Sequence, residues 1–372
     1  ASGRIDLARA VISGWISADG ERIAAGPASA ATLHAESTIE GHVGAPVLVA
    51  TVRGTDVHVT AAGKEPLVYP SAAGSARVAL APTPRVLDAS LRIAAKGAPG
   101  VTARAAAIHF DRGIVIEGGA LEGLGAPLTI DARVTPSGVA VRTKADGLDL
   151  RKAAALTGIE ELRLLPEGTR GTVDVDLTTD ARRTRGHVDL VVEGGEGAPS
   201  GELHAEIEGR LVSARARASL EGVGTIEVPL AELELDGPLS ARALARAAGV
   251  LELRGDVDLG HGAALLAGEA VERMQGAAHL TARVTRGAHG QPPVVSATAQ
   301  TRGLEVLPAG AAAPIGGVDG SLHLAYDGAT DDTELALVAW DARGLLASAG
   351  VKARVPLRAW TKGEASLDAA TL

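Results

Sequence analysis

Apolar and polar residues alternate with a period of two along almost the whole chain. In the segment 171–177 the apolar set is Val173, Val175 and Leu177, and Thr and Asp residues fill the positions between them. Such alternation places apolar side chains on one face of a β-sheet and polar side chains on the other. Gly, Pro and Asp residues separate about two dozen such runs at the ~8 to 12 residue spacing of short antiparallel strands. The pattern therefore predicts an all-β protein built as an elongated antiparallel sheet.

Three stretches break the alternation and have helical character, at residues 149–157, 240–248 and 263–275. In the second stretch Ser240 is a suitable N-cap, and Gly249 could end the helix as the residue after its C-cap. Helices this short are marginal alone and need tertiary packing. We therefore expect a few short helices that pack against the sheet or its open end.

A weak internal repeat follows the same order each time. A Gly-Leu-x-Leu/Val or similar strand end comes first, a variable insert follows, and a Gly then opens an alternating strand, as at 147–177, 236–259 and 302–324. Repeated supersecondary units favour an extended array over separate compact domains. We interpret residues 1–372 as one elongated array with approximate units 1–144, 145–235, 236–300 and 301–372.

A sheet that is apolar on one face must cover that face, and few helices are available to do so. A closed barrel or sandwich is one solution, and a long sheet folded about its axis into a trough is the other. The inward positions carry mainly Val, Leu, Ile and Ala, and the chain has only 1 Phe, 2 Tyr and 3 Trp. Such side chains would not easily fill the ~10 Å between facing sheets. We expect a β-taco, a curled sheet with a hydrophobic interior, and a self-packed core remains the alternative.

An apolar groove of this kind suits an acyl chain, since each buried CH₂ contributes about 0.8 kcal/mol. Nearly equivalent rungs on many strands would let a lipid slide along the groove. The candidate groove residues are the inward positions of the alternating runs: Val173, Val175, Leu177, Val188, Leu190, Leu203, Ile207, Ile226, Val228, Leu233, Leu235, Leu280, Val284, Leu322, Leu324, Leu335, Leu337, Val351, Val355 and Leu357.

Motifs for catalysis, metal binding and nucleic-acid binding are missing from the sequence. Cys is absent, and no nucleophile elbow, P-loop, dinucleotide fingerprint or zinc-protease motif occurs. The ten His residues are scattered, and the doublets Asp174/Asp176 and Asp256/Asp258 lack the Gly and Glu of a calcium loop. The formal net charge is −9 with both signs interspersed, which argues against a nucleic-acid partner. We expect no enzyme activity, no catalytic residues, no metal and no cofactor.

Several segments carry a family resemblance. These are Gly-His-Val-Gly-Ala-Pro-Val-Leu-Val-Ala (41–50), Val-Arg-Gly-Thr-Asp-Val (52–57), Gly-Leu-Asp-Leu (147–150) and the closing Val-Pro-Leu-Arg (355–358) before Leu367 and Asp368. Together they resemble the TamB family, in which a Gly-x-x-x-x-Pro-x-Leu segment and a following Gly-x-Asp-Leu/Val segment recur in the same way. The resemblance spans essentially the whole chain.

The resemblance implies an AsmA-like periplasmic bridge with a β-taco groove. Such proteins are tethered to the inner membrane, contact a BamA-like outer-membrane partner, and are linked to phospholipid transport and to assembly of outer-membrane β-proteins. We expect this chain to be part of a longer one, with its anchor and partner-binding parts outside it. The leading hypothesis is a periplasmic phospholipid conduit. The alternatives are an assembly module for outer-membrane proteins that acts by β-strand augmentation, and a structural or adhesive β-solenoid with a dry core.

Overall fold

The structure is a computed structural model, and it describes residues 2–6, 9–25, 28–59, 67–94, 100–157, 162, 165–180, 183–195, 197–260, 271–310, 312–341 and 349–356. The contacts divide the chain into two compact units, Ala1–Ala181 and Arg182–Leu372. Each unit is an antiparallel meander of β-strands with one short α-helix of six to eight residues in the described part. The all-β antiparallel architecture is therefore confirmed.

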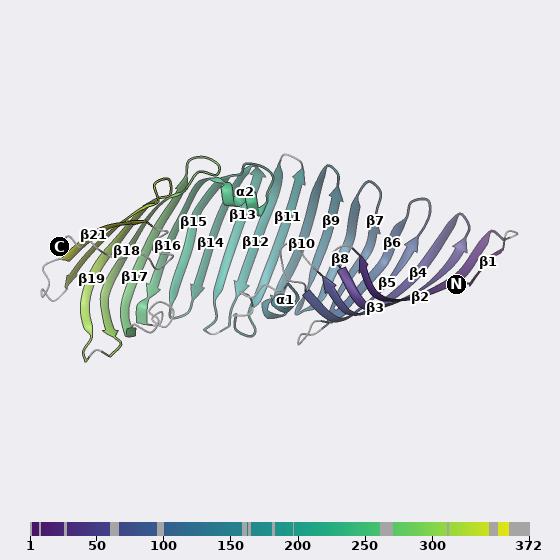
Figure 1. Cartoon of the computed structure of the whole chain (residues 1–372), viewed down its shortest axis with the longest axis horizontal. Coiled ribbons are helices and arrows are strands. Elements are labelled where there is room, and N and C mark those ends of the chain that lie inside the picture. Colours follow the sequence, from purple (N-terminus) through teal and green to yellow (C-terminus); the bar gives the residue numbers. More distant parts are fainter. Residues whose placement is uncertain are drawn as a thin grey trace. The chain divides into compact units, whose positions relative to one another are not determined.

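The first unit contains strands β1 to β11, and the strands lie side by side in chain order (Figure 1). Within the described residues of this unit, the strands pair with their neighbours in the chain, as β2 with β3 and β9 with β10. The strands are β1 (Ser2–Asp6), β2 (Val11–Ala25), β3 (Ala28–His42), β4 (Ala45–Val59), β5 (Leu67–Ala79), β6 (Arg85–Ala94), β7 (Val101–His109), β8 (Ile114–Leu124), β9 (Ala126–Thr135), β10 (Gly138–Asp149) and β11 (Arg170–Asp180).

The second unit repeats this arrangement, with each strand antiparallel to the next along the chain. The strands are β12 (Thr184–Glu193), β13 (Ser200–Gly209), β14 (Leu211–Leu220), β15 (Gly224–Glu234), β16 (Ala248–Asp258), β17 (Val271–Arg286), β18 (Val294–Pro308), β19 (Ile315–Asp327), β20 (Asp332–Asp341) and β21 (Ala349–Pro356). Within the described residues of either unit the sheet is neither closed nor strongly curled. The predicted sheet is thus present as an open meander.

Two of the three predicted helices are confirmed. Helix α1 (Leu150–Thr157) follows β10, and helix α2 (Ala241–Arg246) lies between β15 and β16. Ser240 is the N-cap of α2, and its hydroxyl accepts a hydrogen bond from the Ala243 amide at 3.1 Å. Gly249 does not end this helix, because Ala247 is the C-cap and Gly249 already belongs to β16.

The prediction of a third helix at 263–275 is wrong for residues 271–275, which form part of a strand. Residues 271–275 begin β17 and pair with the end of β18, Met274 with Val306 and Gln275 with Glu305. Cross-strand pairing overrides the local helix preference there, since tertiary contacts outweigh propensity. Residues 263–270 lie outside the described residues.

Two strands of the first unit, β6 and β8, each contain a β-bulge. Asp88 in β6 and Gly118 in β8 have φ angles of 50° and 58°, and the register shifts beside both positions. An extra residue of this kind increases local twist and bends the strand. The bends occur in the middle of the sheet, next to the small residues that are described below.

The tightly packed core is small for a chain of this length. Among the described residues, the largest fully buried side chains are Leu235, Val101, Thr169 and Thr184. One buried cluster consists of Val101, Leu124, Ala145 and Leu148, at the ends of β7, β8 and β10 beside helix α1. Most apolar side chains on the sheet are only half-buried, so the apolar face has little covering of its own.

Candidate functional site

The strand register places the apolar set of the first unit on one face. Across β4 to β8, one row runs Val52, Gly74, Leu91, Ala103 and Leu121, each directly paired with the next. Paired residues of antiparallel strands have side chains on the same face. A second row, four or five residues away along the strands, includes the paired residues Val78 and Val86, then Ile108 and Ile116. Both rows carry large aliphatic side chains.

A row of small residues separates these two rows, and we call it the alanine row. It consists of Ala50, Ala76, Ala89, Ala105 and Gly119, where Ala50 pairs with Ala76 and Ala89 pairs with Ala105. Gly119 pairs with Ile130 of β9, which ends the row on that side. Small residues between two rows of larger ones leave a furrow in the apolar face. Because the rows cross the strands, the furrow also runs across the strands.

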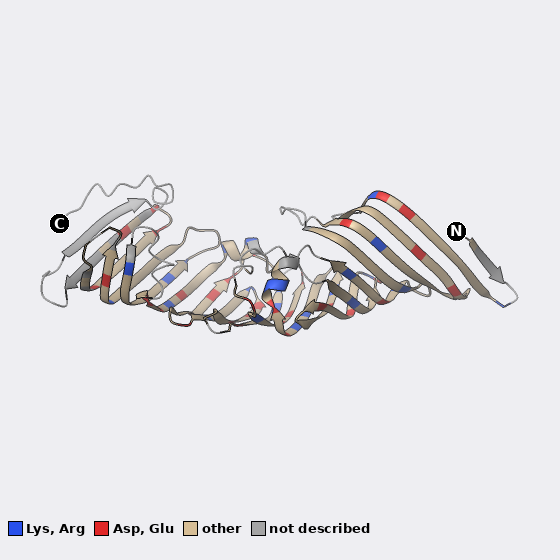
Figure 2. Cartoon of the chain, turned by 90° about the horizontal axis from the view of Figure 1, so that it is seen from below, with Lys and Arg blue, Asp and Glu red and all other residues tan. Residues whose placement is uncertain are grey.

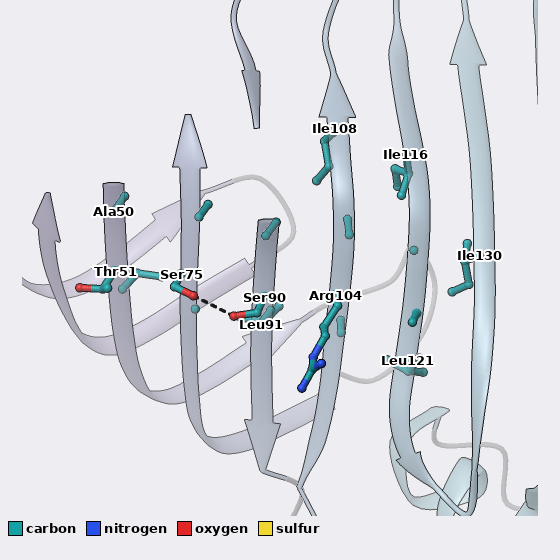
Figure 3. Close-up of a pocket in the computed structure, with 18 residues that line it drawn as sticks. Ala50, Thr51, Ser75, Ser90, Leu91, Arg104, Ile108, Ile116, Leu121 and Ile130 are labelled. Carbon is teal, nitrogen blue, oxygen red and sulfur yellow. Dashed lines mark hydrogen bonds between the residues drawn. The ribbon is translucent and has the colours of Figure 1, made fainter. Parts of the chain in front are cut away.

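The furrow coincides with an open hollow of about 420 Å³, which falls in the usual range for ligand pockets of about 300 to 1,000 Å³. All five members of the alanine row line it, together with residues of the two flanking rows. In Figure 3, Ile108 and Ile116 lie toward one end of the strands and Leu121 toward the other. The lining residues of the apolar face have hydrocarbon side chains, and the hollow is also lined by Thr51, Ser75, Ser90 and Arg104 from the alternate strand positions.

Polar residues near the hollow belong to the opposite face of the sheet. Ser75 pairs with Ser90, and their hydroxyls are hydrogen-bonded at 2.8 Å (Figure 3). Ser90 pairs with Arg104, whose guanidinium forms an ion pair with Glu122 at 3.3 Å. These polar groups have partners in one another and in Glu122, so the lining of the hollow is mainly apolar.

The two long margins of the apolar face differ in burial. At one margin the cluster of Val101, Leu124, Ala145 and Leu148 has exposed fractions of only 1–5%. At the other margin, where β7 turns into β8 and β9 into β10, Phe110, Ile114, Val134 and Val139 are 40–53% exposed. At β7 and β8 the apolar face is thus bordered by packed side chains at one margin and by exposed side chains at the other.

Residues of both charge signs are spread along the strands (Figure 2). Arg142 and Lys144 of β10 form ion pairs with Asp176 and Asp174 of β11 at 2.6 and 2.9 Å. The pKa of each cation is raised, chiefly by the hydrogen bond to its carboxylate partner. The four side chains are 34–70% exposed, so these ion pairs contribute little stability.

A His-containing row recurs on the outer face of both units. Asp19, His34 and Arg53 stand opposite one another on β2, β3 and β4. The His34 imidazole contacts Asp19 through Nδ1 at 2.6 Å and Glu36 through Nε2 at 3.3 Å. These contacts raise the pKa of His34, the hydrogen bond to Asp19 most of all.

The second unit contains the same row as Asp189, His204 and Arg215. His204 is hydrogen-bonded to Asp189 and contacts Glu206 at 3.4 Å, and its pKa is raised, first by Asp189. Both rows match the short sequence repeat Leu-His-Ala-Glu at 33–36 and 203–206. Each imidazole contacts one carboxylate through Nδ1 and another through Nε2, so its protonated form can pair with both.

Three predicted groove residues belong to the first unit. Val173, Val175 and Leu177 of β11 are half-buried and pair with inward positions of β10, Leu177 with Val141. They continue the apolar face two strands beyond Ile130. They do not line the hollow itself.

In the second unit the register again places the predicted residues in common rows. Leu190 pairs with Leu203, and Leu322 pairs with Leu337. Leu235 and Ile207 are buried and offer a ligand almost no surface, whereas Ile226 and Leu322 are exposed. The following are half-buried: Val188, Leu190, Leu203, Val228, Leu233, Leu280, Val284 and Leu324.

The last predicted residues are described only in part. Backbone pairing continues the rows through β20 and β21, Leu335 with Ala353, Leu337 with Val351 and Thr333 with Val355. Leu357 lies outside the described residues. Another hollow of about 470 Å³ includes Leu190, Leu203, Ala216 and Val228 in its lining, with charged neighbours such as Asp189 and Arg217.

Sequence reasoning missed the alanine row. The predicted groove residues come from strands with Val, Leu or Ile at the inward positions, whereas β4 to β8 carry Ala and Gly at many inward positions. The signal that could have found it is the Ala72-x-Gly74-x-Ala76-x-Val78 alternation in β5, which has period two but small residues. Small side chains lower the hydrophobic contrast of a strand, although they are what leaves room for a ligand.

Other chemistry is not indicated in the part of the chain that the structure describes. No group of three or more His, Asp or Glu residues there is arranged to hold a metal ion. None of the helices described is both long and apolar enough to cross a membrane. In comparisons with known proteins, no family model, no curated protein and no solved structure matches this chain.

Proposed function

We propose that the apolar face binds the acyl chains of phospholipids and that the protein is a non-enzymatic lipid conduit. The observation that supports this most is the uncovered furrow over β4 to β9, a hollow of about 420 Å³ with a mainly apolar lining. An empty apolar cavity of roughly 150 Å³ already suffices for a benzene ring. The furrow is larger, elongated and open, which suits a flexible chain better than a compact ligand.

The dimensions of the furrow favour an acyl chain. Six strands at a spacing of about 4.8 Å extend over about 24 Å, and one leaflet of a ~30 Å hydrocarbon core is only about 15 Å thick. An acyl chain of ordinary length therefore fits within the furrow across the strands. Each CH₂ that leaves water contributes about 0.8 kcal/mol, so even half a chain in contact with the rows would give useful affinity.

Movement along the protein follows from repetition of the rows. In the second unit the rung of Leu253, Ala282, Ala297 and Leu324 again pairs residue by residue across β16 to β19. Many similar rungs give a bound chain no single deep minimum. Through the resemblance to the TamB family, the proposal also includes a curled β-taco, a location in the periplasm, a tether to the inner membrane and a BamA-like outer-membrane partner.

A photo-crosslinking experiment in cells tests the proposal on one strand. A photoreactive residue is placed at Leu91, which lines the hollow, and in a second protein at Arg92, the next residue on the opposite face. We expect phospholipid adducts at Leu91 and none at Arg92. Equal labelling at both positions, or adducts only at Arg92, would show that the apolar face does not bind lipid.

One observation favours the assembly of outer-membrane β-proteins as a second candidate function. Strand β1 pairs only with Val11–Trp15 of β2, so among the described residues Ile16–Ala25 pair with β3 on one side and with no strand on the other. An unpaired edge can accept a strand from another chain. Disulfide trapping between a Cys at Ser17 and Cys residues in a nascent outer-membrane strand would support this function, and trapping that is no better at Ser17 than at Ser90, inside the sheet, would exclude it.

A further inference from the structure

The pattern of small and large inward residues inverts at β9. On β8, Gly119 belongs to the alanine row, and Leu121 and Ile116 stand on either side of it in the two flanking rows. On β9 the partner of Gly119 is Ile130, whereas the partner of Ile116 is Ala132. A large side chain therefore stands in line with the alanine row directly after five strands that carry only Ala or Gly there.

Ile130 forms one end of the hollow. Its side chain is half-buried and lines the hollow, and Figure 3 places it and Ala50 at opposite ends of the row. Gly119 lies directly beside it and has no side chain. The alanine row is therefore free of bulk up to the Ile130 side chain.

No row of small residues continues the furrow past β9 within the described residues of this unit. Ile130 pairs with Thr143 of β10, whose hydroxyl donates a hydrogen bond to the Thr129 carbonyl oxygen at 2.8 Å. The neighbouring row offers no detour, because Ala132 pairs with Val141, which is again large. The furrow consequently ends at β9.

The other end of the alanine row has a different character. Ala50 pairs with Ser37 of β3, which is small, half-buried and carries a hydroxyl. Ser37 pairs in turn with Ile16 of β2, which is 52% exposed and does not line the hollow. Because buried polar groups need hydrogen-bond partners, the oxygen-bearing end of an acyl chain fits the β3 end and its methyl end fits against Ile130.

We propose that Ile130 is the end wall of the furrow and limits the length of the acyl chain that the alanine row holds. This inference rests on the proposed lipid-binding function, and it adds selectivity for chain length. From Ala50 to Gly119 the row crosses five strands, which is about 19 Å at a spacing of about 4.8 Å. An extended chain advances about 1.2 Å per bond, so about sixteen carbons lie on the row before the terminal methyl group meets Ile130.

Competition of saturated fatty acids against a bound fluorescent fatty acid tests the inference on the full chain, with chains of about 12 to about 20 carbons. One side of the bound chain faces water, so each CH₂ on the row should raise the affinity about twofold, which is half the logarithmic gain of full burial. The gain should stop at about sixteen carbons in the wild type. Ile130→Ala opens one more strand spacing, so there the gain should continue for about four further carbons.

Ile108→Ala is the matched control, because the same change is made at a residue that lines the hollow from one side of the alanine row. It should weaken the binding of every chain by a similar factor and leave the break at about sixteen carbons. Thermal unfolding shows whether the variants are folded. Ile130→Val removes only one CH₂ from the wall and should move the break by about one carbon, so it replaces Ile130→Ala if that protein does not fold.

The outcomes separate the end wall from the proposed function. Wild-type affinity that rises steadily to the longest chain, or a break at the same length in wild type and Ile130→Ala, would overturn the end wall and leave lipid binding intact. An equal shift of the break in Ile108→Ala would also overturn it, because loosening of the hollow would then be the cause. A wild-type protein that binds no fatty acid of any length would overturn the proposed function and the end wall together.

Discussion

Replacing one small residue of the alanine row by a large one should block the furrow. Ala76 is half-buried on β5 and lines the hollow. It pairs with Ala50 of β4, and Val78 follows two residues later on the same face. Ala76→Leu adds three carbon atoms to a space that is open and unoccupied by other side chains. The added atoms should displace about three CH₂ groups of a bound acyl chain.

The expected loss is about 2.4 kcal/mol at about 0.8 kcal/mol per CH₂, which corresponds to an affinity about sixtyfold weaker. The matched control is Ala73→Leu on the same strand. Ala73 is exposed on the outer face and pairs with Arg53 and Arg92, so the same change there adds bulk away from the furrow. The control protein should bind as the wild type does.

Titration of the full chain with a fluorescent fatty acid measures the effect, and thermal unfolding shows whether the fold is intact. We expect Ala76→Leu to unfold at the wild-type temperature or slightly above it, since the new side chain gains apolar contacts without overpacking. Equal affinities of the Ala76→Leu and Ala73→Leu proteins would refute the alanine row as the binding site. A large loss of stability in Ala76→Leu would show that the hollow is not free space.

Three further predictions concern the fold and its linkage to ligand and pH. At pH values below 6.5, replacing His34 and His204 by Gln should lower the thermal unfolding temperature. In that pH range both imidazoles are protonated in the folded and the unfolded protein, and in the folded protein they are paired with carboxylates. Because both pKa values are raised on folding, this stabilisation is lost as the pH rises through the folded-state pKa, and a difference that grows with pH would contradict the ion-pairing role. Gly119→Ala should destabilise the first unit by about 1 to 3 kcal/mol in urea denaturation, because a Cβ there would lie 2.3 Å from the Ile130 carbonyl oxygen. Gly195→Ala, with nothing within 4 Å, should have no such effect, and equal effects would exclude the steric cause. A saturating fatty acid at about 100 times its dissociation constant should stabilise the first unit by about 2.7 kcal/mol in calorimetry, and an unchanged unfolding transition would argue against binding to the folded state.

Period-two alternation predicted the architecture because the strands whose side chains the structure describes mostly have one polar face and one apolar face. Val173, Val175 and Leu177 lie in register with inward positions of β10, as the alternation implied. Ser240 predicted the start of α2 because capping is a local interaction. The stretch at 263–275 failed because its last five residues pair with a strand that follows them in the chain, and such a partner leaves no local signature.

The site was harder to predict than the fold for a related reason. Alternation finds the inward phase, but it does not distinguish an inward residue that is buried from one that borders free space. Leu235 and Val175 fit the same pattern, and the structure buries the first completely and the second only by half. The alanine row became visible only through the register, because its members come from five strands whose alignment depends on the bulges at Asp88 and Gly118.

The two faces of the sheet together explain how an apolar face can remain available in water. Exposed pairs such as Arg142 with Asp176 add little stability, so the fold depends on the strand ladders and on half-buried rows. Half-burial is what adjacent aliphatic side chains on one sheet provide by contact with each other, without a second layer. Larger inward side chains would bury more area but would also fill the furrow and favour packing against another sheet. The small inward residues of β4 to β8 therefore bury less area and stabilise the fold less, but they leave apolar surface accessible. An acyl-chain binding site requires such accessible apolar surface.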